Sequence, residues 1–209
     1  MKLVAATNNL HKLEEIRYFL EPLGVEVSGI VDLNISLPDD LEVFSTYSEN
    51  AQAKCDYVSR FTTLPILADD SGLEIETLNA KPGIHSARYS ETGLDHDNRK
   101  KVMLEMNSVS LEKRGAKFIC VLCLLVCGRH FFFQGESFGS ILTKEEGSNG
   151  FGYDSLFYCL INKKSYANLT RIEKLEVCHR GLALKLLQEW IKKDKIPKVG
   201  LEPTKGCPH

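Results

Sequence analysis

The sequence lacks a strong excess of charge of either sign. Its 26 Lys and Arg residues against 28 Asp and Glu residues give a formal net charge of -2 at pH 7. Proteins that bind nucleic acid or anionic membranes nonspecifically carry a basic footprint, and this balance provides none. We therefore expect no nucleic-acid partner and no membrane partner. Any anionic ligand must be held by a local arrangement of residues.

Long apolar runs and paired cysteines are also missing. The longest apolar run, FICVLCLLVCG at residues 118–128, is too short to span a bilayer as a helix. The first residues contain the strand-like KLVAA and show no charged-then-apolar secretory pattern. The seven cysteines have no paired metal-ligand spacing and lie mostly in apolar stretches. We expect reduced core thiols and a cytoplasmic location.

No internal repeat, low-complexity tract or linker divides the 209 residues. An apolar share of 43% and a charged share of 26% are ordinary for a soluble globular protein. This length suits one large domain or two small lobes around one core. The prolines near the C-terminus indicate a loose tail. We expect one domain over residues 1–195 and a loose tail over residues 196–209.

Hydrophobic periodicity indicates alternating strands and helices in the first half of the chain. In the first expected helix Leu13, Ile16 and Leu20 share one side, and in the second Ala51, Cys55 and Val58 face inward. Asp95 or Asp97 is expected to cap a third helix. The expected strands are Lys2–Ala6, Val25–Val31, Pro65–Ala68 and Leu73–Thr77, with a turn between the last two, and the expected helices are Leu10–Leu20, Ser48–Arg60 and one ending at about Met106.

The second half indicates an antiparallel meander followed by a helix. Glycine-bearing turns separate three expected strands, Ala116–Cys127, His130–Gln134 and Ser137–Leu142. Helical periodicity returns in GLALKLLQEWIKK, where Leu182, Leu186 and Trp190 share one side. The whole pattern predicts a mixed α/β fold.

Two polar segments of the first half have residues that suit phosphate binding. In ATNNLHK a strand ends and a helix begins, so backbone N–H groups attract anions and Lys12 adds a positive charge. The alternative is an asparagine N-cap with a solvated lysine. In YSENAQAKC, Glu49 and Lys54 lie on a helix whose other face is apolar. Helix-surface charges of this kind usually only interact with solvent.

A third segment, LADDSGLEIE, places Asp69 and Asp70 side by side after an apolar strand. Adjacent strand residues point to opposite sides, so only one of the two faces a given cleft. One carboxylate can therefore hold a metal while the other braces the turn. Mg²⁺ takes one or two protein carboxylates and completes its shell with water and phosphates. An Asx turn without a metal is the alternative.

Two later segments suit a base. In GSNGFGYDSLFY the glycines let the backbone approach a flat ligand, Phe151 or Tyr153 could stack on it, and Asp154 could accept a hydrogen bond. In EKLEVCHRGLALK, His179 and Arg180 precede the last helix. Arginine only donates hydrogen bonds and therefore favours a carbonyl on a purine edge. The alternatives are an aromatic-lined turn and a surface His-Arg pair.

In their order and spacing these segments resemble the inosine/xanthosine triphosphate pyrophosphatase family. The motifs are TNN…K, SENA…K, ADDSGL, PGI…SARY, GFGYD and K…HRG, over roughly residues 2–192. The resemblance implies an α/β fold with an elongated mixed sheet in two lobes, a central cleft and flanking helices. It also implies a homodimer that hydrolyses ITP, dITP and XTP to the monophosphate and pyrophosphate with Mg²⁺. Alternatives are a pyrophosphatase for other modified nucleoside triphosphates and a nucleotide-binding module without catalysis.

The resemblance also assigns site residues by position. Asp70 would be the catalytic residue that activates water, and Glu42 and Asp70 would bind the metal. Donors at Lys174 and Arg180 suit the 6-oxo group of hypoxanthine or xanthine and disfavour the 6-amino group of adenine. Asp69 is expected to brace the turn. The implied substrate-binding residues are Thr7, Asn8, Asn9, Lys12, Ser71, Phe151, Gly152, Tyr153, Asp154, Lys174, His179 and Arg180.

The chain departs from the family pattern at four positions. Asn8 and Asn149 stand where glycine is common, and asparagine tolerates left-handed backbone conformations. Ser155 stands where proline is usual, and Cys178 where serine is usual. Cys178 lacks the stronger hydrogen bonding of serine beside the expected base pocket. We expect this change to alter base preference without abolishing hydrolysis.

Overall fold

The structure is a computed structural model that describes residues 1–38 and 41–193. The predicted tail, residues 196–209, lies outside the described residues, as do the last two residues of the predicted domain. The chain forms two compact units. Unit 1 comprises residues 1–70, 121–134 and the chain from residue 183, and unit 2 comprises residues 71–120 and 135–182.

The described strands form one eight-stranded mixed sheet in the order β2-β1-β3-β5-β6-β7-β8, with β4 paired to β3. Strand β1 is parallel to both β2 and β3, whereas β4 is antiparallel to β3 and β7 is antiparallel to both β6 and β8. This arrangement confirms the predicted mixed α/β fold. The strands are β1 (Lys2–Ala5), β2 (Glu26–Gly29), β3 (Ile66–Ile75), β4 (Lys81–Pro82), β5 (Gly115–Val126), β6 (Arg129–Ile141), β7 (Phe157–Cys159) and β8 (Lys164–Ser165).

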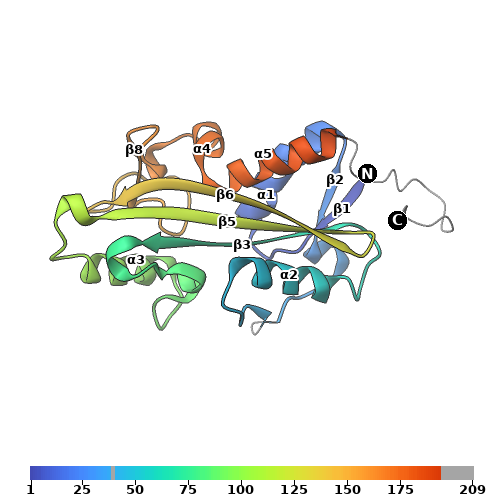
Figure 1. Cartoon of the computed structure of the whole chain (residues 1–209), viewed down its shortest axis with the longest axis horizontal. Helices are drawn as coiled ribbons and strands as arrows, with labels where there is room; N and C mark the ends of the chain where they lie inside the picture. The colour runs from blue at the N-terminus through green and yellow to red at the C-terminus, as the bar shows by residue number, and fades with distance from the viewer. Residues whose placement is uncertain (39–40, 194–209) are drawn as a thin grey trace. The chain divides into compact units, whose positions relative to one another are not determined.

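Helices cover both faces of the sheet, and short 3₁₀ helices occupy several connections. Within unit 1, Figure 1 shows α2 on one side of the long strands and α5 on the other, and within unit 2 it shows α3 on one side and α4 on the other. The helices are α1 (Leu10–Leu20), α2 (Tyr47–Val58), α3 (Asp95–Glu105), α4 (Arg171–Val177) and α5 (His179–Lys192). The 3₁₀ helices are Glu21–Leu23, Ile30–Leu33, Glu76–Leu78, Gly83–Arg88, Leu111–Lys113 and Tyr166–Asn168.

The core of unit 1 forms where α2 packs on the sheet. Ala51, Cys55 and Val58 are fully buried there, as their helical spacing predicted. The Cys55 thiol donates to the backbone carbonyl of Cys123 at 3.2 Å. This packing fixes α2, and with it the polar residues of the same helix, against β3 and β5.

The Asp-Asp-Ser-Gly segment is part of a strand and not a turn. Strand β3 runs through it without interruption, so the prediction of two short strands flanking a turn is wrong. Asp69 and Asp70 are both buried within β3. A buried carboxylate is tolerated where cationic groups and donors satisfy it, and Lys12 and Lys54 provide such partners here. Asp69 therefore braces no turn.

Two further strand and helix predictions are wrong. The two strands predicted at residues 130–134 and 137–142 are one strand, β6, so Gly135 does not break it. Helix α3 begins at Asp95 with Leu94 at the N-cap and no side-chain cap, so neither predicted aspartate caps it. Both aspartates lie in the first helical turn, where their negative charge interacts favourably with the positive end of the helix dipole.

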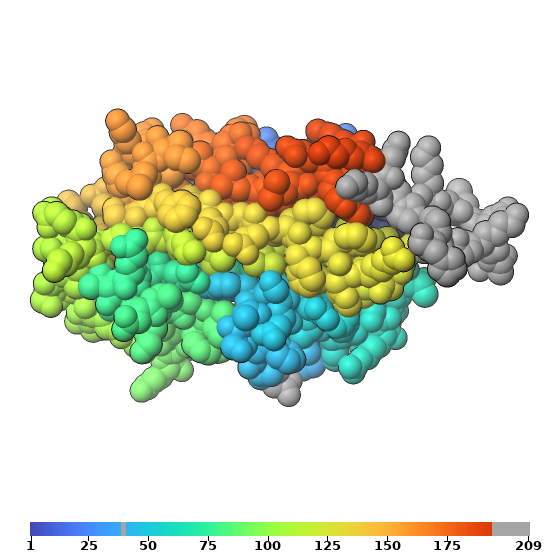
Figure 2. All heavy atoms as spheres, in the orientation of Figure 1, coloured from blue at the N-terminus to red at the C-terminus, as the bar shows by residue number. Residues whose placement is uncertain are grey.

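The spacing of Leu182, Leu186 and Trp190 did not predict which face of α5 is buried. The buried residues are Ala183, Leu184 and Leu187, whereas Leu186 is 45% exposed. Trp190 packs at the edge of this face, with its ring 4.8 Å from that of Phe131. Figure 2 shows the red atoms of α5 lying against the yellow atoms of β6. The buried stripe is therefore rotated around the helix from the side that Leu182, Leu186 and Trp190 share.

The described cysteines differ in state. Five are buried free thiols, as predicted, whereas Cys127 is disulfide-bonded and departs from that prediction. Within residues 1–38 and 41–193, no helix is long and apolar enough to cross a membrane. The free thiols are Cys55, Cys120, Cys123, Cys159 and Cys178.

Candidate functional site

The segment from Thr7 to Lys12 forms the start of α1. Asn9 is the N-cap, and its Oδ1 accepts from the N–H groups of His11 at 2.9 Å and Lys12 at 3.2 Å. The Lys12 ammonium is paired and not freely solvated, because its Nζ lies 2.9 Å from Oδ2 of Asp69 and its side chain is only 17% exposed. The N-cap alternative is therefore correct for Asn9 and wrong for the lysine. A cationic side chain and a helix N-terminus lie together here.

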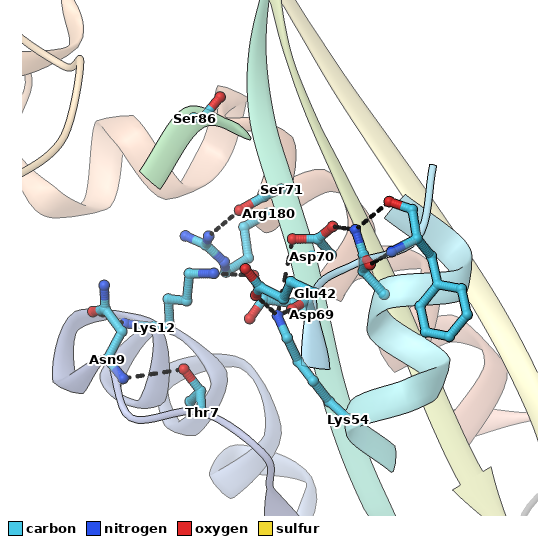
Figure 3. A network of polar contacts seen from close by, with 12 residues as sticks. Thr7, Asn9, Lys12, Glu42, Lys54, Asp69, Asp70, Ser71, Ser86 and Arg180 are labelled. Carbon is cyan, nitrogen blue, oxygen red and sulfur yellow. Dashed lines mark hydrogen bonds and ion pairs between the residues drawn. The ribbon is translucent and has the colours of Figure 1, made fainter. Parts of the chain in front are cut away.

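Lys54, on α2, is a second lysine beside the two aspartates and is buried (Figure 3). Its Nζ donates to the backbone carbonyl of Asp69 at 2.8 Å, pairs with Glu42 and lies 3.9 Å from Oδ1 of Asp70. Burial lowers the pKa of Lys54, but Asp70, Glu42 and Asp69 outweigh it, so its pKa is raised. The interpretation of Lys54 as a solvated surface charge is wrong.

Glu49 behaves differently from Lys54 although both lie on α2. It is exposed, and its carboxylate accepts from the hydroxyl of Thr46, the N-cap of the helix. The backbone N–H of Glu49 donates in return to the Thr46 hydroxyl at 3.2 Å. Glu49 therefore stabilises the helix start and belongs to no cluster of site residues.

Asp70 points away from Asp69, as strand alternation requires. Its Oδ2 accepts from Nδ2 of Asn50 at 3.0 Å, and Oδ1 of Asn50 accepts from the N–H of Phe44 at 3.0 Å. Burial raises the pKa of Asp70, Lys54 lowers it and Glu42 raises it, with a net increase. Asn50 therefore holds both this carboxylate and the loop that carries Glu42.

Glu42 and Asp70 converge on one cation, the Lys54 ammonium. Both present carboxylate oxygens, the ligand type that Mg²⁺ prefers, and Mg²⁺ needs only one or two of them. Within the described part of the chain, no group of three or more His, Cys, Asp or Glu side chains could hold a metal. Two carboxylates, with water and phosphate oxygens completing the shell, are a donor set that fits Mg²⁺.

Sequence reasoning missed Asn50 and misjudged Lys54. The two residues are four positions apart on α2 and flank the buried Ala51 and Cys55. A lysine and an asparagine adjoining an apolar stripe can be buried with it, and then they must contact polar groups. That spacing is the signal that identifies them.

Unit 2 holds the remaining predicted residues. Arg180 is buried, and its Nη2 donates to Oγ of Ser71 at 3.0 Å (Figure 3). His179 is buried as well, and its ring stacks on Phe118 with centroids 4.7 Å apart and planes 10° apart. The alternative of a surface His-Arg pair is therefore wrong.

The glycine loop before β7 is built around Asp154. Oδ2 of Asp154 accepts from the N–H of Phe151 at 2.9 Å and from Nζ of Lys174 at 2.5 Å. The Lys174 ammonium also lies 4.7 Å from the centre of the Phe151 ring, a cation–π distance. Gly150 has φ +79°, and a Cβ there would lie 2.0 Å from Oδ2 of Asp154. The close approach requires glycine at this position.

Tyr153 makes a contact that the sequence did not predict. It is buried, and its hydroxyl donates to the backbone carbonyl of Ser86 at 2.7 Å. Burial raises the pKa of this hydroxyl, so it stays protonated and can donate. Tyr153 therefore anchors the loop, whereas Phe151, which is half-buried, presents its ring beside Lys174.

Cys178 directly precedes α5, at its N-cap position, and is buried. Its sulfur accepts from the N–H of Gly181 at 3.3 Å, a weak substitute for a serine oxygen. Gly181 is itself required, since a Cβ there would lie 1.9 Å from the backbone carbonyl of Leu175. The junction between α4 and α5 is thus tight, and it sets the start of the helix that carries His179 and Arg180.

Cys178→Ser is expected to raise the free energy of unfolding by about 0.5–1 kcal/mol, because a hydroxyl oxygen caps a helix better than sulfur does. Urea unfolding followed by circular dichroism measures the change. The matched control is Cys123→Ser, at a fully buried core cysteine. There, replacing the thiol with the more polar hydroxyl is expected to destabilise the protein. Equal destabilisation by both substitutions would contradict the capping role of Cys178.

Comparison with known proteins identifies the family. The model of the Ham1 family matches residues 3–190 of the chain. The chain belongs to the Ham1 family. A dITP/XTP pyrophosphatase of Mannheimia succiniciproducens is 39% identical over 197 residues, which cover 90% of this chain and 96% of that protein. The predicted family is thus confirmed.

Solved structures agree with the Ham1 assignment. A HAM1 protein from Coxiella burnetii is 34% identical, with a TM-score of 0.84, and the match covers 92% of this chain and 99% of that one. A nucleoside-triphosphatase / dITP/XTP pyrophosphatase from Mycobacterium abscessus is 35% identical, with a TM-score of 0.73 and coverage of 90% and 98%. The mixed α/β fold is therefore the fold of its relatives.

Two of the positions at which this Ham1 chain departs from the family pattern, Asn149 and Ser155, make side-chain hydrogen bonds. Among the described residues with positive φ neither Asn8 nor Asn149 appears, so the left-handed tolerance of asparagine is not used. Asn149 donates instead through Nδ2 to the backbone carbonyl of Leu169 at 3.1 Å. Ser155 donates through its hydroxyl to Glu145 at 2.7 Å. Asn149 and Ser155 thus hold the glycine loop with side-chain hydrogen bonds.

Proposed function

We propose that this Ham1 protein hydrolyses ITP, dITP and XTP to the monophosphate and pyrophosphate, and so removes deaminated purine nucleotides from the pool. It is a nucleoside-triphosphate pyrophosphatase, a hydrolase of phosphoric anhydride bonds. The observation that carries the proposal is the buried Asp70 carboxylate, which lies beside Glu42 and Lys54 and is held by Asn50. The names of relatives such as the Mannheimia succiniciproducens enzyme support the substrate class.

Asp70 suits the role of a base for the attacking water. Its carboxylate is buried, and burial and Glu42 raise its pKa, which makes it a better proton acceptor than an exposed aspartate. Glu42 and Asp70 would hold Mg²⁺, the proposed cofactor. When bound, Mg²⁺ supplies positive charge that offsets the charge developing on the pyrophosphate. The Lys54 ammonium keeps the two carboxylates in place.

The start of α1 suits the triphosphate. Its first N–H groups and the Lys12 ammonium both favour anions. Asp69 fixes Lys12 through an ion pair in which the aspartate side chain is only 1% exposed. Thr7 and Asn8 precede the helix, and the Thr7 hydroxyl accepts from the N–H of Asn9 at 3.1 Å. We propose that this segment binds phosphate oxygens.

The residues of the glycine loop and of α4 and α5 suit the base. Phe151 and Gly152 would lie against a flat ring, and Lys174, His179 and Arg180 provide hydrogen-bond donors. Donors suit the 6-oxo group of hypoxanthine and xanthine, whereas adenine would place its 6-amino donor against them. Such unmatched buried donors can discriminate by a factor on the order of 10⁴. Ser71, which accepts from Arg180, would contact the same substrate.

We also propose that residues 1–195 act as a single pyrophosphatase domain of two lobes, in a cytoplasmic homodimer. The support for these points is the family resemblance and the ordinary composition of the chain.

Pyrophosphate release from a panel of triphosphates tests the proposed function. With Mg²⁺, kcat/KM for dITP, ITP and XTP is expected to exceed that for dATP by at least about 10²-fold, because of the donors around the base. A chelator is expected to abolish turnover, and added Mg²⁺ to restore it. If no triphosphate releases pyrophosphate, the proposed enzymatic activity is refuted. Preference for a triphosphate with another modified base would favour the alternative, a pyrophosphatase for other modified nucleoside triphosphates. Turnover unchanged by the chelator would refute the proposed requirement for Mg²⁺.

A further inference from the structure

The glycine loop is held at its centre by helix α3. The N–H of Gly152 donates to Oδ2 of Asp95 at 2.8 Å, and the carbonyl of Gly152 accepts from Nη1 of Arg99 at 2.9 Å. Asp95 and Arg99 are four residues apart and therefore lie on one face of the helix. One helix thus binds both backbone hydrogen-bonding groups of the residue between Phe151 and Tyr153.

Arg99 also connects the two flanks of the loop. Its Nε donates to Oε2 of Glu145 at 2.8 Å, and the Ser155 hydroxyl donates to the same oxygen at 2.7 Å. Glu145 precedes the loop, and Ser155 directly follows Asp154. A proline at position 155 could make no such contact, because it has no side-chain donor. Arg99 and Glu145 therefore link the start, the middle and the end of the loop.

Helix α3 is itself anchored, so it can serve as a fixed support. Asn98 is fully buried, and its Oδ1 accepts from the N–H of Ser90 at 2.7 Å. Its Nδ2 donates to the backbone carbonyls of Ala87 at 3.2 Å and Gly93 at 3.3 Å. A movement of the first turns of α3 would break these buried contacts, so the positions of Asp95 and Arg99 are well defined.

The side of Gly152 on which a Cβ would lie is open, so the two hydrogen bonds are its described contacts with α3. Its φ is +59°, and a Cβ built there would meet no heavy atom within 4 Å in the described part of the chain beyond its neighbours in sequence. The residues beside it are coupled, because Oδ2 of Asp154 accepts from both the N–H of Phe151 and Nζ of Lys174. A shift of Gly152 would displace Phe151 and Asp154 together.

We propose that Asp95, Arg99 and Glu145 are positioning residues for base selection, and that they act by holding Gly152 and the flanks of its loop. The inference rests on the proposed function, since base selection presupposes a nucleoside triphosphate substrate. The three residues act through Phe151 and Asp154 and not by direct contact with the base. Ser155 belongs to the same network, because its hydroxyl donates to Glu145 and the proline that is usual at this position could not.

Kinetics of two α3 variants test the inference. Asp95→Ala removes the acceptor for the Gly152 N–H. Arg99→Lys keeps the positive charge, but a single ammonium cannot replace the guanidinium N–H groups that bind Gly152 and Glu145 together. In each variant kcat/KM for dITP is expected to fall by about 10-fold, mainly through KM, and its ratio to that for dATP to narrow by about 10-fold. Lys100→Ala, at an exposed position of the same helix, is the matched control and should match the wild type.

Hydrogen exchange gives a readout that does not depend on turnover. In protein labelled with ¹⁵N-glycine, the Gly152 amide is expected to exchange at least about 10-fold faster in Asp95→Ala than in the wild type, since its acceptor is lost. An active wild type whose two variants keep full selectivity would overturn this inference alone. A wild type with no turnover on any triphosphate would overturn the proposed function as well, and unchanged Gly152 exchange would refute the hydrogen bond itself.

Discussion

Asp70→Asn is expected to lower kcat for dITP by at least about 10³-fold while the chain stays folded, because an amide can neither take a proton from water nor serve as an anionic metal ligand. The fold is expected to survive because asparagine has the same shape as aspartate. Burial raises the pKa of Asp70, which shows that its charged form is held at a cost in free energy. Removing the charge removes that cost, and Lys54 loses one partner but keeps Glu42 and the Asp69 carbonyl.

Pyrophosphate release and thermal unfolding by circular dichroism separate the two effects. The control is Asp56→Asn, because Asp56 lies on α2 of the same unit with a side chain that is 47% exposed. That variant is expected to keep wild-type turnover. Near-normal turnover of Asp70→Asn would contradict the role of Asp70, whereas an unfolded Asp70→Asn protein would contradict the expectation of a stable fold.

The elements predicted well are those whose burial follows a local pattern. Helix α1 has the predicted bounds and α2 nearly so, since their apolar residues recur at helical spacing. Strand β3 could not be predicted in this way. Aspartate is frequent in turns, so the local sequence around Asp69 and Asp70 predicts a turn. The partners of the two carboxylates, Lys12 and Lys54, come from two helices elsewhere in the chain. Tertiary ion pairs overrode the local preference.

Helix α5 shows a second limit of periodicity. The residues Leu182, Leu186 and Trp190 form one stripe, and Ala183, Leu184 and Leu187 form another that is equally regular. Only the second is buried. Because several apolar stripes fit one helix, the contacts of the folded chain, and not the spacing, decide which stripe turns inward.

The candidate site could be predicted from motif order, but the contacts within it could not. Asn50 binds Asp70 across 20 residues, and Tyr153 binds Ser86 across 67. Neither contact has a local signature. Sequence reasoning left open whether Phe151 or Tyr153 stacks on a base, and it did not reveal that the Tyr153 hydroxyl anchors the loop while the Phe151 ring lies beside Lys174.

Lys174→Met is expected to lower the free energy of unfolding by about 3–5 kcal/mol, because it leaves the Asp154 carboxylate buried without the ammonium that neutralises it. The two side chains are 10% and 6% exposed, and their charged atoms are 2.5 Å apart. By contrast, Lys117→Met in the more exposed Lys117–Glu136 pair of the same unit is expected to cost only about 0–1 kcal/mol. Urea unfolding of both variants gives the comparison.

A double-mutant cycle separates the structural role of the Asp154–Lys174 pair from its proposed role in base binding. In Asp154→Asn/Lys174→Met both charges are gone, so much of the lost stability is expected to return, with a coupling free energy of about 1–3 kcal/mol. Turnover of dITP is not expected to return, because the Lys174 donor and the negative charge of Asp154 are both absent. Additive losses of stability would contradict the coupling. Recovery of dITP turnover together with stability would show that the pair only supports the fold, and base selection would then rest on Arg180 and His179.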